Sequence, residues 1–369
     1  MDRQTMKNQN HLNVIRQFTH GERMTRQELT KRLGLSRPTV LKSVDELLAK
    51  GVLCESGALA STGGRRAKTL SLNAEGWHVA AIQITRKHVR FALGDLFGEI
   101  GDVEKQTLPF RDETEWYAEL GKRFKAFLGQ EGAAPEQVLG IGVSFPGIID
   151  WQAERILDSH VFHIEQVSLD RFAKYLPCPV VVVNDANCAC LAEQNQDRAK
   201  YFYLSLNESV GGAIVSDHKL LEGSHCRAGE VGHVVIHPGE KMCYCGKAGC
   251  ADPYLSTGVL LEDFDNVDDF FEALLAGDAH AQAIFEQYLE DLAILVSNIN
   301  MLLDTDIIIG GEVGARIEPY MARLTEKVSA LDRFSREVDY LHACRCKTNS
   351  FLKGAAICAA GYFDWRLLK

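Results

Sequence analysis

Apolar residues recur at helical spacing three times within the first fifty positions of the chain. An apolar stripe predicts a first helix within residues 10–20. A capping-box sequence that begins at Thr25 predicts a second helix that ends at Gly34. A third helix is predicted after Ser36, because the apolar residues that follow fall on one face. Two short helices joined by a tight turn, the second of them basic at its start, are typical of a helix-turn-helix.

The polar face of the third helix predicts contacts with DNA bases. Such a helix fits the major groove, and its early residues reach base edges. After Gly51 the sequence indicates two short strands around a loop with two arginines at its tip, and arginines suit phosphates or a narrow minor groove. We therefore predict a winged helix-turn-helix in residues 1–72, with a small helical oligomerisation module as the alternative. The predicted DNA contacts are Arg37, Thr39, Lys42, Ser43, Arg65 and Arg66.

The charge of the chain is divided unevenly. Residues 1–72 hold 13 Lys and Arg against 6 Asp and Glu, whereas the whole chain has a formal net charge of −10. A basic first module on an acidic body predicts that only this module meets a polyanion such as double-stranded DNA. The start of the chain is polar and no run of 18 apolar residues exists. We therefore expect no signal peptide, no membrane contact and a cytoplasmic location.

Strands alternate with helices in residues 73–369, which predicts an α/β body. Apolar runs predict strands at 79–96, 139–143, 179–183, 201–206, 213–215 and 306–309, and longer amphipathic stretches predict helices at 113–129, 186–195 and 280–303. Two hairpin strands followed by a strand and a helix occur twice in this order. This repetition suggests that the body consists of two similar halves.

Three of the eleven cysteines form the sharpest chemical signal in the sequence. Cys243, Cys245 and Cys250 lie in a glycine-rich segment that lets thiolates converge, shortly after the sequence EVGH, whose histidine is His233. Three thiolates and one imidazole complete a closed tetrahedral Zn²⁺ site, which is structural because no position is left for water. On spacing alone His237 is a rival for the fourth ligand, and three unconnected thiols are the alternative to a metal site. Four other cysteines lack this setting and are expected to be buried apolar residues: Cys188, Cys190, Cys344 and Cys346.

EVGH followed by CYCGKAGC resembles the sugar-binding and zinc signatures of the ROK family (repressors, open reading frames, kinases). The order of FPGIID, VVVNDAN and IIIGGEVG around them extends the resemblance over almost the whole chain. The resemblance implies an actin-like, ribonuclease H-like ATPase fold of two lobes, with a sugar bound in the cleft. With its added winged helix, the chain is similar to the repressors of xylose, glucose and N-acetylglucosamine genes in that family.

The resemblance also implies roles for residues of this chain. The implied structural Zn²⁺ ligands are His233, Cys243, Cys245 and Cys250, and the implied sugar contacts are Asn184, Asp185, Glu230, His233 and Asp252. Asp185 matches the base that activates the sugar hydroxyl in kinases of the family, and helix capping after a strand is the alternative for the pair Asn184-Asp185. Asp252 stands where the family usually has Glu, and residues 159–163 lack the usual pattern, so an unusual sugar is expected.

The phosphate-binding half of the cleft departs from the kinase pattern. The first loop of kinases in the family resembles D-x-G-G-T, whereas this chain has Gln83 in place of the acidic residue and Thr85 and Arg86 in place of the glycines. In the second loop, Glu208 would place a negative charge near the triphosphate. A kinase needs glycine-rich backbone and Mg²⁺ ligands to hold phosphates, so both changes argue against ATP binding.

We therefore predict a sugar-responsive transcriptional repressor rather than an enzyme. A homodimer or tetramer would place two winged helices on two half-sites of a DNA operator, and the bound sugar would bias their spacing. The alternatives are a sugar kinase that phosphorylates a hexose with ATP, and a DNA-binding protein whose body only forms dimers. The predicted partners are double-stranded operator DNA and a sugar effector, and the predicted cofactor is structural Zn²⁺.

Overall fold

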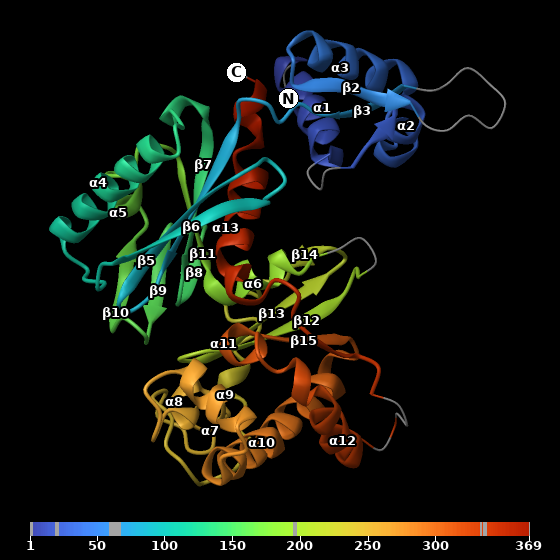
Figure 1. Ribbon diagram of the computed structural model, residues 1–369. Coiled ribbons are helices and arrows are strands. Elements are labelled where there is room, and N and C mark those ends of the chain that lie inside the picture. Colours follow the sequence, from blue (N-terminus) through green and yellow to red (C-terminus); the bar gives the residue numbers. More distant parts are fainter. Residues whose placement is uncertain are drawn as a thin grey trace.

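The computed structural model describes residues 3–18, 22–58, 68–194, 198–332, 334 and 338–368. Three parts follow one another along the chain: a small N-terminal domain, a first lobe in residues 78–184 and a second lobe in residues 201–343 (Figure 1). The predicted domain boundary at residues 72 and 73 falls in the link between the N-terminal domain and the first lobe. Within the described part of the chain, no helix is both long and apolar enough to cross a membrane.

The N-terminal domain contains the predicted helix-turn-helix. In the capping box of α2 (Arg26–Leu33), the side chain of Thr25 accepts a hydrogen bond from the amide of Glu28, whose carboxylate accepts one from the amide of Thr25. Gly34 ends α2 in the left-handed region with a φ of 61°, and α3 (Arg37–Ala49) begins after a short turn. The first helix, α1 (Arg3–Ile15), begins earlier than the predicted range 10–20 and continues into one tighter turn, η1 (Arg16–Phe18).

A three-stranded sheet completes the winged domain. Its strand order is β1 (Met24–Thr25), β3 (Lys68–Leu72), β2 (Leu53–Ala58), and both pairs are antiparallel. The two strands predicted after Gly51 are thus present as β2 and β3. The tip of the wing, with Arg65 and Arg66, lies outside the described residues.

Two five-stranded sheets of the same topology form the body. The strand order is β11-β7-β4-β5-β6 in the first lobe and β16-β15-β12-β13-β14 in the second. In each sheet the first three strands in sequence are antiparallel neighbours, and the last two continue the sheet parallel to the first. The two similar halves that the sequence suggested are therefore confirmed, and they form an α/β body of two lobes.

The strands and helices of the body have the following bounds. The strands are β4 (His78–Ile84), β5 (His88–Gly94), β6 (Ile100–Thr107), β7 (Val138–Phe145), β11 (Val180–Asn184), β12 (Tyr201–Leu206), β13 (Val210–Ser216), β14 (Lys219–Leu220), β15 (Asp306–Gly310) and β16 (Leu341–Ala343), with a smaller sheet of β8 (Ile148–Asp150), β9 (Arg155–Ser159) and β10 (Ile164–Ser168). The helices are α4 (Thr114–Gln130), α5 (Asp170–Ala173), α6 (Asp185–Ala192), α7 (Asp252–Leu255), α8 (Thr257–Leu260), α9 (Val267–Leu275), α10 (Ala279–Leu303), α11 (Gly311–Gly314), α12 (Met321–Leu331) and α13 (Ser350–Tyr362). Short 3₁₀ turns are η2 (Pro135–Gln137), η3 (Val231–His233), η4 (Glu318–Tyr320), η5 (Lys347–Asn349) and η6 (Asp364–Leu368).

Helices cover both faces of the first sheet. Successive side chains of a strand point to opposite faces, and on β4 the residues Ala80 and Ile82 join the core under α4, whereas Val79 and Ala81 join the core under α13. In the second lobe α9, α10 and α12 pack on the far side of the sheet (Figure 1). Three of the four cysteines that were expected to be buried are buried, namely Cys188, Cys190 and Cys344. The fourth, Cys346, is partly exposed.

The two lobes are joined by α6 and by α13, which cross each other closely. α6 leads from β11 of the first sheet to β12 of the second, and α13 leaves the second lobe to pack on α6, β4 and β7. At the crossing, a Cβ added to Gly354 would lie 1.7 Å from the carbonyl oxygen of Cys188. On the sheet side, a Cβ added to Gly142 would lie 1.9 Å from the carbonyl oxygen of Ala355. Backbone therefore packs against backbone on two sides of α13.

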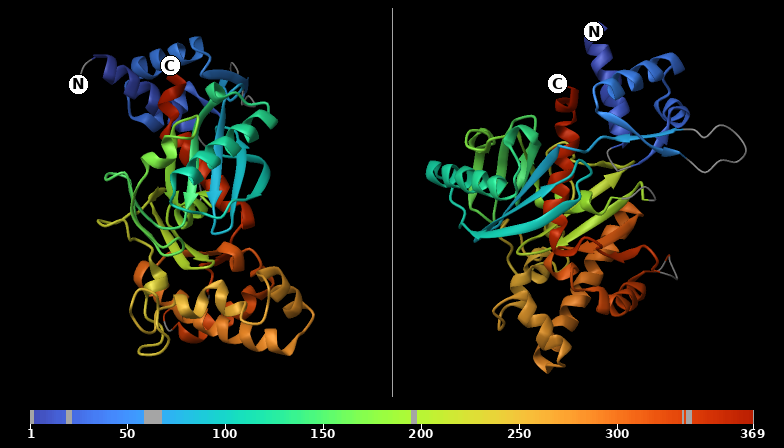
Figure 2. Two further views of the ribbon diagram at one scale, coloured as in Figure 1. Left: turned by 90° about the vertical axis from the view of Figure 1, so that its left-hand side faces the viewer. Right: turned by 45° about the horizontal axis from the view of Figure 1, so that its top comes forward.

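The far end of α13 reaches the N-terminal domain, as two views show (Figures 1 and 2). After α13 the chain forms η6, in which Asp364 is 1% exposed. Its carboxylate accepts a hydrogen bond of 2.6 Å from Nε of Arg16 in the N-terminal domain. Apolar residues of both parts, such as Phe18 and Leu367, belong to one buried cluster. The winged domain is thus fixed to the end of the helix that crosses the junction of the lobes.

We predict that Gly354→Ala lowers the melting temperature of the protein. The added methyl group would overlap the carbonyl of Cys188, so α6 and α13 must separate, at a cost of about 1–3 kcal/mol. Gly361→Ala in the same helix is the matched control. Because a Cβ there meets no atom within 4 Å, it is expected to be neutral or stabilising by up to about 1 kcal/mol. Equal melting temperatures for the two variants would contradict the close crossing.

Candidate functional site

A pocket lies between the two lobes, at the carboxyl ends of strands of the first sheet. Its volume is about 80 Å³. The first lobe contributes Gly147, Asp158 and His160, together with Asp185 at the start of α6. The second lobe contributes residues 209–212 and the pair Glu230 and His233. At about 10–15 Å³ for each water, the pocket has room for roughly five to eight waters, the scale of one small polar molecule.

Asn184 and Asp185 lie side by side at the end of β11 but have different partners. The amide oxygen of Asn184 accepts a hydrogen bond of 2.9 Å from the amide of Asn187, and its amide nitrogen donates to the carbonyl oxygen of Gly147 at 2.9 Å. Asn184 therefore performs the helix capping that was the alternative for this pair. Asp185 accepts a hydrogen bond from the amide of Ala186, and burial raises its pKa to about 6.

Glu230 faces the same pocket from the second lobe. Burial and, after it, the negative charge of Asp185 raise the pKa of Glu230 to about 7, with further contributions from Asp158 and Asp252. Carboxyl groups thus gather around the pocket from both lobes. Near neutral pH the Glu230 carboxyl is divided between its neutral and charged forms, so it can both donate and accept hydrogen bonds.

Asp252, a predicted sugar contact, does not line the pocket. Its Oδ1 accepts a hydrogen bond of 2.7 Å from the amide of Val210, and the side chain is buried. The Asp252 side chain therefore binds the backbone at the start of β13, and its charge contributes to the raised pKa of Glu230 in the pocket. Asp158 lines the pocket and was not predicted, although it directly precedes residues 159–163, which lack the usual pattern of the family.

The four predicted metal ligands converge beside the pocket. The donor atoms of His233, Cys243, Cys245 and Cys250 all lie within 4.8 Å of one another. The two Sγ atoms of Cys245 and Cys250 are 3.7 Å apart, and Nδ1 of His233 is 3.6 Å from Sγ of Cys243. A tetrahedron with Zn–S bonds of about 2.3 Å has S–S edges of about 3.8 Å, so the donor set and its spacing fit Zn²⁺.

His237 is not part of this cluster. Its Nε2 forms a hydrogen bond of 2.7 Å with Oδ1 of Asp291 on α10. Of the two candidates for the fourth ligand, His233 lies with the three cysteines and His237 does not. The other ring nitrogen of His233, Nε2, points away from the thiols and lies 3.2 Å from the hydroxyl of Tyr244, at the pocket.

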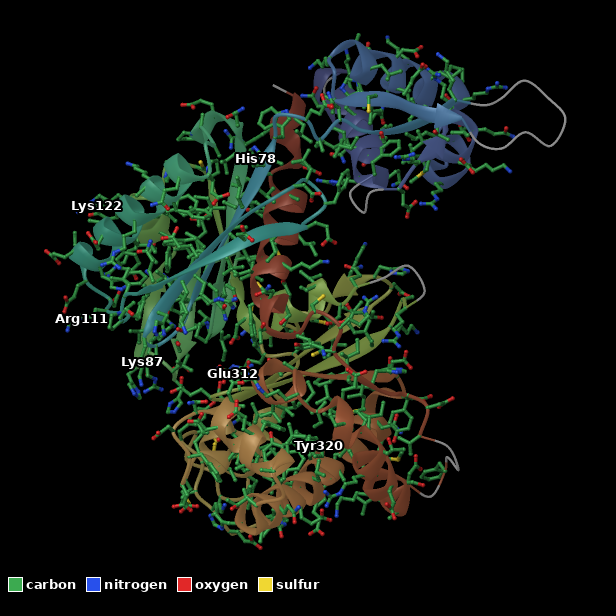
Figure 3. The ribbon with its side chains drawn as sticks, in the orientation of Figure 1. His78, Lys87, Arg111, Lys122, Glu312 and Tyr320 are labelled. Carbon is green, nitrogen blue, oxygen red and sulfur yellow. The ribbon has the colours of Figure 1, made fainter. Side chains whose placement is uncertain are left out.

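A larger cavity of about 690 Å³ adjoins the pocket, because its lining residue Glu208 lies between Asn207 and Ser209, which line the pocket. Lys87 of the first lobe and Glu312 of the second mark its two sides (Figure 3). Arg86 and Glu208 both line it and form an ion pair of 2.7 Å that joins the two lobes. Arg86 and Glu208, which replace residues of the two kinase loops, therefore bind each other in the structure.

The turn between β4 and β5 is also filled by its own side chains. The hydroxyl of Thr85 donates to the carbonyl oxygen of His88 at 3.0 Å. Gln83 accepts a hydrogen bond of 2.9 Å from Arg90. The side chains that replace the acidic residue and a glycine of the kinase loop thus have partners within the protein.

Of the four predicted DNA contacts on α3, three have exposed or partly exposed side chains. Arg37 and Lys42 are exposed, and Thr39 is partly exposed with its hydroxyl 2.7 Å from that of Ser36. Ser43 contradicts the prediction because it is only 6% exposed. It lies three residues after Val40 and one before Val44 in sequence, and so on the face that packs into the domain.

Comparison with known proteins places these features in one family. Residues 79–361 match the ROK family, and residues 7–53 match a winged helix-turn-helix DNA-binding domain. A xylose repressor of Caldicellulosiruptor bescii is 26% identical over 88% of this chain and 88% of its own. The DNA-binding transcriptional repressor Mlc of Escherichia coli is 22% identical over 94% of this chain and 91% of its own.

Two solved structures share the fold. A ROK family transcriptional regulator, described as a homologue of the Escherichia coli Mlc protein, superposes with a TM-score of 0.80 and 23% identity over 98% of both chains. A ROK family glucokinase from Streptomyces griseus, solved with glucose and AMPPNP, superposes with a TM-score of 0.63 and 22% identity over 76% of this chain and 98% of its own. The chain belongs to the ROK family and carries a winged helix-turn-helix domain ahead of the ROK body.

Proposed function

We propose that the protein is a sugar-responsive transcriptional repressor, in which the winged domain binds operator DNA and the pocket between the lobes binds the sugar. The proposal is carried by one observation: the pocket and the winged domain are connected through α6 and α13. Asp185 in the pocket is the first residue of α6, α6 packs on α13, and the chain after α13 is bonded to Arg16. The names of the relatives, which include xylose repressors and Mlc, support the same function.

The chemistry of the pocket favours an uncharged monosaccharide as the effector. Asp158, Asp185 and Glu230 offer carboxyl oxygens to hydroxyl groups, and His233 offers a ring nitrogen. The same carboxyl groups would repel a sugar phosphate, because charges interact more strongly in a partly buried site than in water. The volume of about 80 Å³ is on the scale of one small polar molecule.

The coupling between sugar and DNA follows from the two lobes. A sugar that contacts Asp185 and Glu230 bridges the lobes and stabilises one angle between them. The sugar can shift the equilibrium between two lobe arrangements only by the difference between its affinities for them. A change of angle moves α13 at its crossing with α6 and, through Asp364 and Arg16, turns the winged domain. In a homodimer or tetramer that turn changes the spacing of two winged domains and hence their fit to two half-sites.

A sugar kinase is the second candidate. Two observations favour it: Asp185 sits at the position of the kinase base with a pKa raised to about 6, and a cavity of about 690 Å³ adjoins the pocket. The Arg86–Glu208 ion pair argues against it, because these side chains occupy the mouth where phosphates would meet the two loops. We therefore propose that the protein is not an enzyme.

The proposed Zn²⁺ site gives a first prediction. About one Zn²⁺ per chain is expected to co-purify, held by His233, Cys243, Cys245 and Cys250. Cys245→Ser should lose both the metal and the response to sugar, because the ligand cluster fixes the ring of His233 at the pocket. Cys54→Ser, in the N-terminal domain, is the matched control and should keep both. Elemental analysis that finds no zinc in the native protein would refute the site.

The proposed sugar contact gives a second prediction. A thermal-shift screen of monosaccharides should identify a ligand that, at 100 times its dissociation constant, adds about 2.7 kcal/mol to the free energy of unfolding. Glu230→Ala should abolish the loss of operator binding caused by that sugar and leave operator affinity itself unchanged, as measured by fluorescence anisotropy. Glu262→Ala, an exposed carboxylate of the same lobe outside the pocket, should respond like the wild type. A full sugar response in Glu230→Ala would exclude this contact.

The nucleotide half of the cleft gives a third prediction. Calorimetry with ATP–Mg²⁺ should detect no binding tighter than about 1 mM, with or without the sugar, because Glu208 repels phosphates and Gln83 cannot organise the metal. No phosphosugar should form over hours. A ROK glucokinase assayed in parallel is the positive control. Submillimolar ATP affinity together with the appearance of phosphosugar would establish the kinase instead.

A further inference from the structure

Two aromatic rings from opposite lobes stack at the edge of the pocket. The ring of His160 lies in the turn between β9 and β10, and that of Tyr244 lies between two of the proposed zinc ligands. Their ring centroids are 3.5 Å apart and their planes differ by only 4°. Both residues line the pocket, which makes this stack part of its wall.

The first lobe holds His160 firmly. The hydroxyl of the preceding Ser159 donates a hydrogen bond of 2.5 Å to the carbonyl oxygen of Pro146, and Ser159 is buried. Phe162, two residues after His160, packs on Phe110 and Phe145 with ring-centroid distances of 4.3 and 4.8 Å. His163 closes the turn with a φ of 53°, in a region that residues other than glycine rarely adopt. A turn anchored on both sides presents the His160 ring in one place.

The second lobe holds Tyr244 from both ends. Its neighbours Cys243 and Cys245 belong to the converging cluster, and the amide of Cys243 donates to the carbonyl oxygen of Lys247 at 2.8 Å. The hydroxyl of Tyr244 lies 3.2 Å from Nε2 of His233, and the two rings meet edge to face. Tyr244 thus spans the distance from the proposed sugar contact His233 to the first lobe.

We propose that the His160–Tyr244 stack is the wall that limits the site to a single, unsubstituted sugar ring. This inference rests on the proposed function. The face of each ring that is turned away from the stack offers apolar surface to the C–H groups of a sugar ring. The Tyr244 hydroxyl, which lies 3.2 Å from Nε2 of His233, can form a further hydrogen bond with a sugar hydroxyl. A second ring or an N-acetyl group on that side would have to separate the stack. His160 comes from residues 159–163, the segment that lacks the usual pattern of the family, and Tyr244 comes from the cysteine knuckle.

The test is calorimetry on the full-length protein with the monosaccharide identified by the thermal-shift screen, its N-acetylated derivative and a disaccharide of the same unit. The wild type should prefer the monosaccharide by at least about a hundredfold. Tyr244→Ala and His160→Ala should each weaken monosaccharide binding about tenfold and reduce the preference to less than about tenfold. The double variant should equal either single variant, because the loss of one ring already removes the stack. Tyr244→Phe keeps the ring and should keep the preference.

Zinc content is measured in every variant, because loss of zinc shows that the cysteine knuckle has lost its structure. If the preference for the monosaccharide is lost only in variants that also lose zinc, the proposed role of the stack is wrong. A preference that survives in both alanine variants, with only a lower melting temperature, would also overturn it and show that the stack merely joins the lobes. A thermal-shift screen in which no sugar stabilises the wild type would refute the proposed function itself. Unequal, additive effects of the two substitutions would show that the rings act separately rather than as one wall.

Discussion

The close crossing of α6 and α13 is the constraint on which the rest of the molecule depends. Gly354 lets backbone meet backbone there, because any Cβ would overlap the carbonyl of Cys188. Both chain segments that join the lobes pass through this point, one beginning in the pocket at Asp185 and the other ending beside the winged domain. We propose that this junction turns a small change of lobe angle into a displacement at the far end of α13, since well-packed interiors shift as units rather than deform.

Side chains from the two lobes meet at two places along the cleft. The Arg86–Glu208 ion pair joins the lobes at the larger cavity, and the His160–Tyr244 stack joins them at the pocket. In a kinase of this fold, a nucleotide would meet the two loops that carry Arg86 and Glu208. Here the protein's own Arg86 and Glu208 join the lobes at that place.

Local patterns in the sequence predicted much of the fold. The capping box at Thr25 and Glu28 uses neighbouring residues, so spacing alone predicted it. The spacing of the cysteines indicated a metal site but left His233 and His237 open as the fourth ligand, and the family resemblance favoured His233. The repeated order of strands likewise predicted two similar halves. Ser43 was misplaced because a polar residue on a short helix can point inward as easily as outward. The hydrogen bond between Asp252 and the amide of Val210 could not be predicted, because the two residues lie on different elements.

The contacts that shape the cleft could not be predicted, because their partners are far apart in sequence. Nothing local indicates that Arg86 will meet Glu208, or that His160 will lie on Tyr244. The most direct test of the whole account is a thermodynamic cycle, in which sugar affinity is measured by calorimetry on the free protein and on its complex with operator DNA. The account predicts that DNA weakens sugar binding by the same factor, about 5–150-fold, by which sugar weakens DNA binding. Equal sugar affinities with and without the operator would contradict it.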